Sequence, residues 1–214
     1  MRVSNAVKRM AAGIVLAVPL WVGAGVYEDM LHAIEIDDQR TVASLLKRGV
    51  DVNTTTQKGE SLLILAARSG KPIIVETLLA ARPNINARNA QGETALMHAA
   101  IKGRADIVKL LLSAGAEVNH SGWTPLMYAA ATNQMDISRM LLARGAQVNA
   151  VSDNGTTPLM MAAREGHLPM VLLLMEHGAD VNYSSAFGYN ALGVAIDRGR
   201  REIAEVLTRA GARR

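Results

Sequence analysis

The feature that most constrains this chain is an internal repeat of about 33 residues. A Val-Asn or Ile-Asn pair recurs with spacings of 33, 33, 30 and 33 residues, ending at Asn53, Asn86, Asn119, Asn149 and Asn182. A glycine follows each pair and opens the next unit, at Gly59, Gly92, Gly122, Gly155 and Gly188. A fixed period of this length indicates stacked units that bury their apolar residues against their neighbours.

Each unit is predicted to contain two helices joined by a short turn. In the unit that opens at Gly155, Thr157 is suited to cap a helix and Pro158 to occupy its first turn. Gly166 is suited to end that helix in the left-handed conformation. Residues 167–176 supply a second amphipathic helix, and a loop then leads to the next unit. The sequence therefore predicts an all-α fold.

This pattern resembles the ankyrin repeat, most clearly in residues 111–119 (LLSAGAEVN) and 122–130 (GWTPLMYAA). The resemblance covers about residues 28–214 and implies an α-solenoid of stacked helix-turn-helix-loop units. The predicted organisation is a signal peptide (1–24), an N-terminal capping helix pair (28–58), four ankyrin repeats (59–91, 92–121 with a short finger, 122–154 and 155–187) and a C-terminal capping repeat (188–214).

The sequence departs from the family pattern inside the first helix of each unit. The family's Thr-Pro pair is intact at Thr124-Pro125 and Thr157-Pro158 and is weaker elsewhere. The histidine that the family places two residues after this proline is replaced by Ile64, Met97, Met127, Met160 and Gly193. We expect the methionines at this position to fill the core, because their flexible side chains adapt to irregular spaces. Copper binding or oxidant scavenging is the alternative role for them.

Residues 1–24 have the features of a secretory signal peptide. The first ten residues carry three basic groups and no acid, residues 11–22 are uncharged and mostly apolar, and small residues precede a cleavage site expected after Ala24. The apolar stretch is shorter than the roughly 20 residues of a membrane helix. We expect Sec-type export to a bacterial periplasm, with no stable membrane insertion after cleavage. The alternatives are secretion, or retention of the leader as a tether.

The formal charge of +4 is concentrated at the two ends of the chain. Residues 25–197 hold 14 basic and 17 acidic groups, whereas residues 198–214 hold six arginines and two glutamates. We interpret the arginine-rich end as the polar cap that a terminal repeat needs. We therefore predict no nucleic-acid partner. The absence of cysteine excludes a disulfide framework, a thiolate metal site and a cysteine nucleophile.

The resemblance implies a monomeric, non-enzymatic module without cofactor or metal. Such a module binds a protein through a concave face of inner helices and through finger loops between units. Aromatic residues, which are frequent interface hot spots, fall mainly on these surfaces. The predicted partner-binding residues are Trp123, Tyr128, His120, Phe187, Tyr189, Tyr183, Arg164, Lys102, Glu93 and Arg68. The alternative for Trp123 and Tyr189 is that they brace adjacent fingers.

The shorter spacing of 30 residues has a definite location. Asn119 and Gly122 are three residues apart, where the corresponding interval in every other unit is six. The deletion removes a finger tip and predicts a notch beside Trp123 and His120. This notch is either a neutral deletion or a shape that a partner fills.

The sequence offers little support for catalysis. The five histidines form no HExxH motif, and no G-x-S-x-G serine or phosphate-binding glycine loop is present. The pair Asp37-Asp38 falls between two predicted helices, where helix capping explains it. The alternatives to a general binding module are an inhibitor or immunity-type binder of an exported enzyme or toxin, a secreted effector acting on host proteins, and a hydrolase or metal-dependent enzyme.

Overall fold

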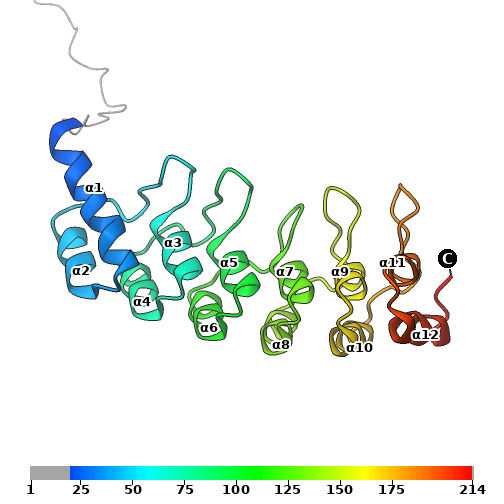
Figure 1. The fold of residues 1–214 in the computed structure, drawn as a ribbon. Helices are drawn as coiled ribbons and strands as arrows, with labels where there is room; N and C mark the ends of the chain where they lie inside the picture. The colour runs from blue at the N-terminus through cyan, green and yellow to red at the C-terminus, as the bar shows by residue number, and fades with distance from the viewer. Residues whose placement is uncertain (1–19, 214) are drawn as a thin grey trace, which may run out of the picture.

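The computed structural model describes residues 20–213, which form six successive helix pairs arranged in one row (Figure 1). These residues contain twelve helices and no β-strand, so the prediction of an all-α solenoid is confirmed. Residues 1–19, most of the predicted signal peptide, lie outside the described residues. Among the described helices, none has the length and apolar character that crossing a bilayer requires.

The helices form an inner and an outer row. The inner row, nearest the fingers in Figure 1, comprises α1 (Leu20–Glu35), α3 (Leu62–Ser69), α5 (Ala95–Ile101), α7 (Pro125–Ala131), α9 (Pro158–Glu165) and α11 (Ala191–Asp197). The outer row comprises α2 (Gln39–Lys47), α4 (Pro72–Ala80), α6 (Ala105–Ser113), α8 (Met135–Ala143), α10 (Leu168–Glu176) and α12 (Arg201–Arg209). Each inner helix packs against the inner helix of the next unit. The finger loops precede α3, α5, α7, α9 and α11 and project on one side of the row.

The same capping contact starts five of the inner helices. One side-chain oxygen accepts the backbone N–H three residues later at 2.7 to 3.3 Å, in Ser61, Thr94, Thr124, Thr157 and Asn190. Such a contact satisfies one of the N–H groups that a helix start leaves unpaired. Thr157 and Pro158 therefore start α9 as predicted, and Gly166 ends it with a φ of 86°. Asp38 caps α2 in the same way, by accepting the N–H of Thr41.

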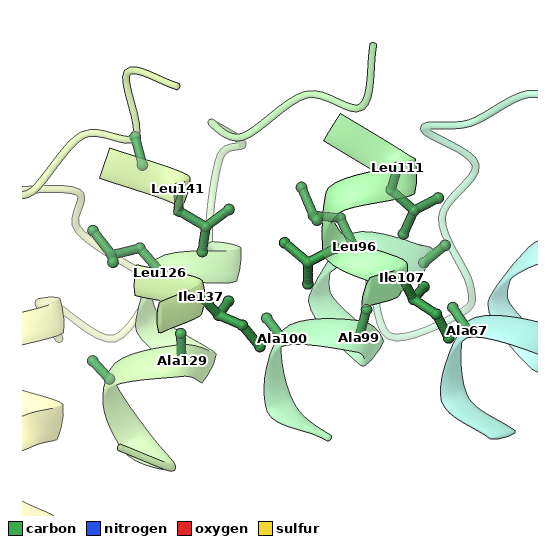
Figure 2. Packing of buried hydrophobic residues seen from close by; sticks show 14 of the residues in the cluster. Ala67, Leu96, Ala99, Ala100, Ile107, Leu111, Leu126, Ala129, Ile137 and Leu141 are labelled. Atoms are coloured by element: carbon green, nitrogen blue, oxygen red, sulfur yellow. The ribbon is translucent and has the colours of Figure 1, made fainter. Parts of the chain in front are cut away.

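The core repeats the same side chains from unit to unit (Figure 2). Four buried residues of one unit recur 30 positions later in the next: Leu96, Ala99, Ile107 and Leu111, then Leu126, Ala129, Ile137 and Leu141. Figure 2 shows Ile107 pointing toward Ala67 of the preceding unit and Ile137 pointing toward Ala100. The small alanines allow the isoleucine of the next unit to approach closely, and this joins the units into one core.

The methionines at the recurring core position are buried as predicted. Met97, Met127 and Met160 are at most 4% exposed. This burial supports their packing role.

The recurring asparagines connect successive loops. Asn53 Oδ1 accepts the backbone N–H of Asn84 at 2.7 Å. The same contact to the next loop, at 2.8 to 3.0 Å, is made by Asn86, Asn119, Asn149 and Asn182. The landmark that reveals the repeat in the sequence is thus a cross-link between neighbouring units.

Four of the five fingers in the described chain are closed by one polar residue. In each, the backbone N–H of this residue donates to the carbonyl four positions later at 2.8 to 3.0 Å. Its side-chain oxygen accepts the returning N–H at 2.8 to 3.2 Å, in Thr56, Asn89, Ser152 and Ser185. The finger between Asn119 and Gly122 is three residues shorter and has no residue at this position.

Helix α1 starts at Leu20, inside the predicted signal peptide and ahead of the predicted capping pair 28–58. Among the α1 side chains whose burial the structure describes, from Gly25 onward, Met30, Ala33 and Ile34 are buried, and all three follow the predicted cleavage site.

Candidate functional site

The structure brings six of the ten predicted site residues together in two places on the face formed by inner helices and fingers. The first, here called the central cluster, consists of Glu93, His98, Trp123 and Tyr128, on the second and third fingers and on α5 and α7. The second, here called the C-terminal cleft, is a cleft of about 490 Å³ between the last two units. Its lining comprises Asn154, Gly155, Thr156, Met160, Met161, Arg164, Phe187, Tyr189, Val194, Asp197 and Arg198.

The side chains of the central cluster contact one another. The Tyr128 hydroxyl donates to Glu93 Oε1 of the preceding unit at 2.8 Å, and Asn89 Nδ2 donates to Glu93 Oε2 at 3.1 Å. His98 Nε2 lies 3.2 Å from Glu93 Oε2. The ring of Trp123 lies on that of Tyr128, with centroids 5.5 Å apart and planes tilted by 34°. These contacts fix two adjacent fingers to the inner helices beneath them.

The protonation states follow from these contacts. Burial alone would raise the pKa of Glu93, but the hydrogen bonds from Asn89 and Tyr128 and the nearby His98 lower it overall. Burial, reinforced by the Glu93 carboxylate, raises the pKa of Tyr128. Burial lowers the pKa of His98 despite the opposing pull of Glu93. At neutral pH the cluster therefore holds a carboxylate, a neutral imidazole and a protonated phenol.

His120 turns inward at the shortened finger. Its Nε2 lies 3.0 Å from the Glu117 carbonyl oxygen, and its side chain is only 5% exposed. Burial, followed by the positive charge of Arg88, lowers the pKa of His120. Arg88 also donates from Nη2 to the Ser121 carbonyl at 3.3 Å and so links this finger to the preceding one. These contacts hold the shortened finger in place without the closing residue of the other fingers.

The C-terminal cleft differs from the central cluster because its aromatic rings are exposed to solvent. Phe187 is 73% exposed and Tyr189 is 60% exposed, and both lie on the last finger. Met161 on α9 and Val194 on α11 form part of the apolar lining beneath them. An exposed aromatic pair above an apolar lining is typical of a surface that binds another molecule.

Three charged residues lie in the cleft: Arg164, Asp197 and Arg198. Arg164 Nε donates to Glu165 Oε1 at 2.8 Å, and its backbone carbonyl accepts Arg200 Nε at 3.3 Å. The cleft therefore combines apolar surface with hydrogen-bonding groups of both charge signs.

One position in the repeat contributes to the difference between the central cluster and the C-terminal cleft. Trp123 and Tyr189 each follow the glycine that opens a unit, so they occupy the same position. Five residues later, the third unit has Tyr128 and the last unit has Val194. Tyr128 is large enough to support the Trp123 ring and to reach Glu93, whereas the small Val194 leaves space below Tyr189.

The other predicted residues lie apart from the cleft. Tyr183 is half-buried and packs against the core, and Lys102 is exposed at the end of α5. Arg68 on α3 is paired with Glu60 of its own unit. His98, Met161 and Val194 were not predicted as site residues. Their signal in the sequence is a shared repeat position, five residues after Glu93, Thr156 and Tyr189. Within the described residues, no group of three or more acidic or histidine side chains is placed to hold a metal ion.

Comparisons with known proteins agree with this architecture. The family model described as ankyrin repeats (3 copies) matches residues 30–121, 63–152 and 145–213. A chain of the solved complex of the predatory endopeptidase Bd0816 from Bdellovibrio bacteriovorus with immunity protein Bd3460 is similar, with 30% sequence identity and a TM-score of 0.77. The match covers 85% of this chain and 97% of that chain. No curated protein matches this chain significantly.

Proposed function

The chain belongs to the ankyrin-repeat family, and we propose that this protein-interaction module is non-enzymatic and binds its partner mainly at the C-terminal cleft. The observation that carries the proposal is the exposure of Phe187 (73%) and Tyr189 (60%) above an apolar lining. Burying two such rings supplies a large part of the affinity of a typical interface. The stacked units hold these residues in place before binding, so little order is lost when the partner docks.

The central cluster supports this role without being the main contact. Glu93, Trp123 and Tyr128 already contact one another, so a partner would have to compete with these internal contacts. Their contribution is to hold neighbouring fingers in register.

A narrower function is favoured by one observation. The similar solved chain belongs to a complex of an endopeptidase with an immunity protein, and it matches this all-α solenoid over 97% of its length. We take the matched chain to be the immunity protein and propose that the present chain likewise inhibits an exported peptidase. An inhibitor of this kind acts by occupying the enzyme's surface and needs no catalytic group of its own.

Export fits this narrower function, because an inhibitor must reach the compartment of its enzyme. We propose cleavage after Ala24 and release of the mature chain into the periplasm. Cleavage there leaves Met30, Ala33 and Ile34, which are buried on the described part of α1, in the mature chain. Cell fractionation with N-terminal sequencing tests this proposal and should find a periplasmic chain starting at Gly25. A full-length chain in the membrane fraction would contradict cleavage, and accumulation in the culture medium would favour a secreted effector.

Affinity capture tests the binding function. The immobilised chain is compared with Phe187→Ala/Tyr189→Ala and with Ile73→Ala/Leu172→Ala, using periplasmic extract of the source organism. Ile73 and Leu172 are matched controls, because they are 50% and 47% exposed on the outer helices α4 and α10. We expect one partner to be retained by the wild type and the control and lost from the cleft variant. Equal capture by all three chains would rule out the cleft as the binding site.

A second measurement tests the inhibitor function. The captured partner is purified and its peptidase activity is measured while the chain is added. We expect activity to disappear at equimolar chain and to persist with Phe187→Ala/Tyr189→Ala. A partner without peptidase activity would exclude the inhibitor function and leave the binding function standing.

A further inference from the structure

The geometry points to a specific occupant of the C-terminal cleft: a segment of the partner protein in which an apolar side chain stands beside carboxylates. The apolar side chain enters between the finger aromatics and the inner helices, and the carboxylates pair with Arg164 and Arg198. This inference rests on the proposed binding function and names the chemistry that the cleft recognises.

The apolar half of the cleft fits a side chain of a protein segment. Phe187 and Tyr189 stand on the finger, and Met160, Met161 and Val194 line the cleft from α9 and α11. The volume of about 490 Å³ lies within the range of sites that enclose a small ligand or an inserted side chain. Methionine side chains adapt to the shape of what they contact, so this lining tolerates different aliphatic or aromatic residues.

The charged half of the cleft favours carboxylates. Two of its three charged residues are arginines, Arg164 and Arg198, and the third is Asp197. Arg164 donates to Glu165 through Nε, one of five donors on a guanidinium group. The terminal nitrogens of a guanidinium form the planar fork that binds a carboxylate with two parallel hydrogen bonds.

The charge of the surrounding surface agrees with this preference. Residues 198–213 carry five arginines and two glutamates, whereas residues 25–197 are more acidic than basic. Arg200 lies next to the cleft, because its Nε donates to the Arg164 carbonyl. An acidic partner is therefore steered toward this end of the solenoid and away from the rest.

A displayed library of random peptides of about twelve residues tests the inference on the full chain. We expect the selected peptides to share Asp or Glu next to Leu, Ile, Met or Phe. Their affinity should fall at least about tenfold in Arg164→Glu/Arg198→Glu, and it should weaken as salt is added. Lys109→Glu/Arg139→Glu is the control, because it makes the same change of net charge at exposed positions on the outer helices α6 and α8. This control should bind the peptides like the wild type.

The outcomes separate this inference from the proposed function. Selected peptides that lose affinity in Phe187→Ala/Tyr189→Ala but not in Arg164→Glu/Arg198→Glu would overturn the acidic occupant and leave the binding function intact. Peptides indifferent to both variants would overturn both. Tighter binding of a single-stranded oligothymidine than of any selected peptide would assign the cleft to nucleic acid and also overturn the inference. Circular dichroism melting of each variant establishes that a loss of binding is not a loss of folding.

Discussion

Trp123 and Tyr189 occupy the same position in two units of one repeat, yet their surroundings are opposite. The Trp123 ring lies on Tyr128, whose hydroxyl reaches Glu93 in the preceding unit. Tyr189 is 60% exposed and borders a cleft. The finger that carries Trp123 is three residues shorter than the finger that carries Tyr189, and the residue five positions later also differs, being Tyr128 in the first case and Val194 in the second. In this solenoid, the side chain five positions later helps to decide whether an aromatic residue at this position is braced within the array or exposed to solvent.

This contrast separates two demands on the inner face. In the central cluster, Tyr128 and Asn89 donate to Glu93 and the rings of Trp123 and Tyr128 pack together, so the cluster contributes to stability. The C-terminal cleft leaves two rings in water, which adds little to stability and leaves them available for binding. Substitutions in the two places should therefore affect different measurements.

The largest expected effect on stability comes from removing the bracing ring. Trp123→Ala should lower the free energy of unfolding by about 2 to 3 kcal/mol, because it deletes a half-buried ring and its contact with Tyr128. Tyr189→Ala, at the same repeat position, should change it by no more than about 0.5 kcal/mol. Urea unfolding followed by circular dichroism measures both. Equal losses in the two variants would mean that Tyr189 is also a brace.

The next test converts the surroundings of Tyr189 into those of Trp123. Val194→Tyr places at the cleft the residue type that supports Trp123 in the central cluster. The new ring should fill the space below Tyr189, weaken partner binding at least about tenfold and leave the melting temperature unchanged or higher. Partner affinity and thermal melting are measured on the same preparation.

Val194→Ala is the matched control for this conversion, since it changes the same position without filling the cleft. It should retain partner binding. If Val194→Tyr also binds as well as the wild type, the cleft is not the docking site.

A smaller effect is expected from removing one hydrogen bond of the central cluster. Tyr128→Phe keeps the ring under Trp123 but deletes the donor to Glu93. Because the acceptor is a partly exposed carboxylate, the loss should be about 1 kcal/mol. The double variant Tyr128→Phe/Glu93→Gln should lose little more free energy of unfolding than either single variant. Fully additive losses in urea unfolding would show that the two groups do not interact.

The fold was predictable because it depends on features that recur. The glycine and asparagine spacings, the Thr-Pro pair and the apolar helices each appear in several units, so one register accounts for all of them. The reason for the recurring asparagine was not predictable. Its partner is a backbone N–H about 30 residues away, and backbone groups look alike in every sequence.

The candidate site was predictable only in part, because it depends on differences between units. Phe187, Tyr189 and Arg164 were placed on the binding face from the register alone, and the structure brings them into one cleft. The sequence could not separate Trp123 from Tyr189, since that distinction depends on how far Tyr128 reaches toward Glu93. His120 illustrates the same limit: a residue beside a deletion could project or fold inward, and contact with the Glu117 carbonyl holds it inward.

The smallest expected effect concerns pH and again distinguishes the two places. Burial lowers the pKa of His98 in the folded chain below its ordinary value of about 6.5. As the pH falls through the ordinary histidine pKa, His98 binds a proton in the unfolded chain but not yet in the folded chain. The free energy of unfolding therefore decreases with acidification. The lowered pKa of Glu93 acts in the same direction at still lower pH.

Thermal melting between neutral pH and about pH 5, below the ordinary histidine pKa, measures this effect. The melting temperature of the wild type should fall with pH, and His98→Gln should remove part of the fall because it removes the titrating group. His120→Gln should remove a further part, since the pKa of His120 is also lowered by burial. Phe187→Ala/Tyr189→Ala should follow the wild type, because the residues lining the cleft include no histidine. If His98→Gln and the wild type had identical pH profiles, titration of the half-buried imidazole would have no role in the stability of the central cluster. Only the contacts of Glu93 with Tyr128 and Asn89 would then remain to account for its rigidity.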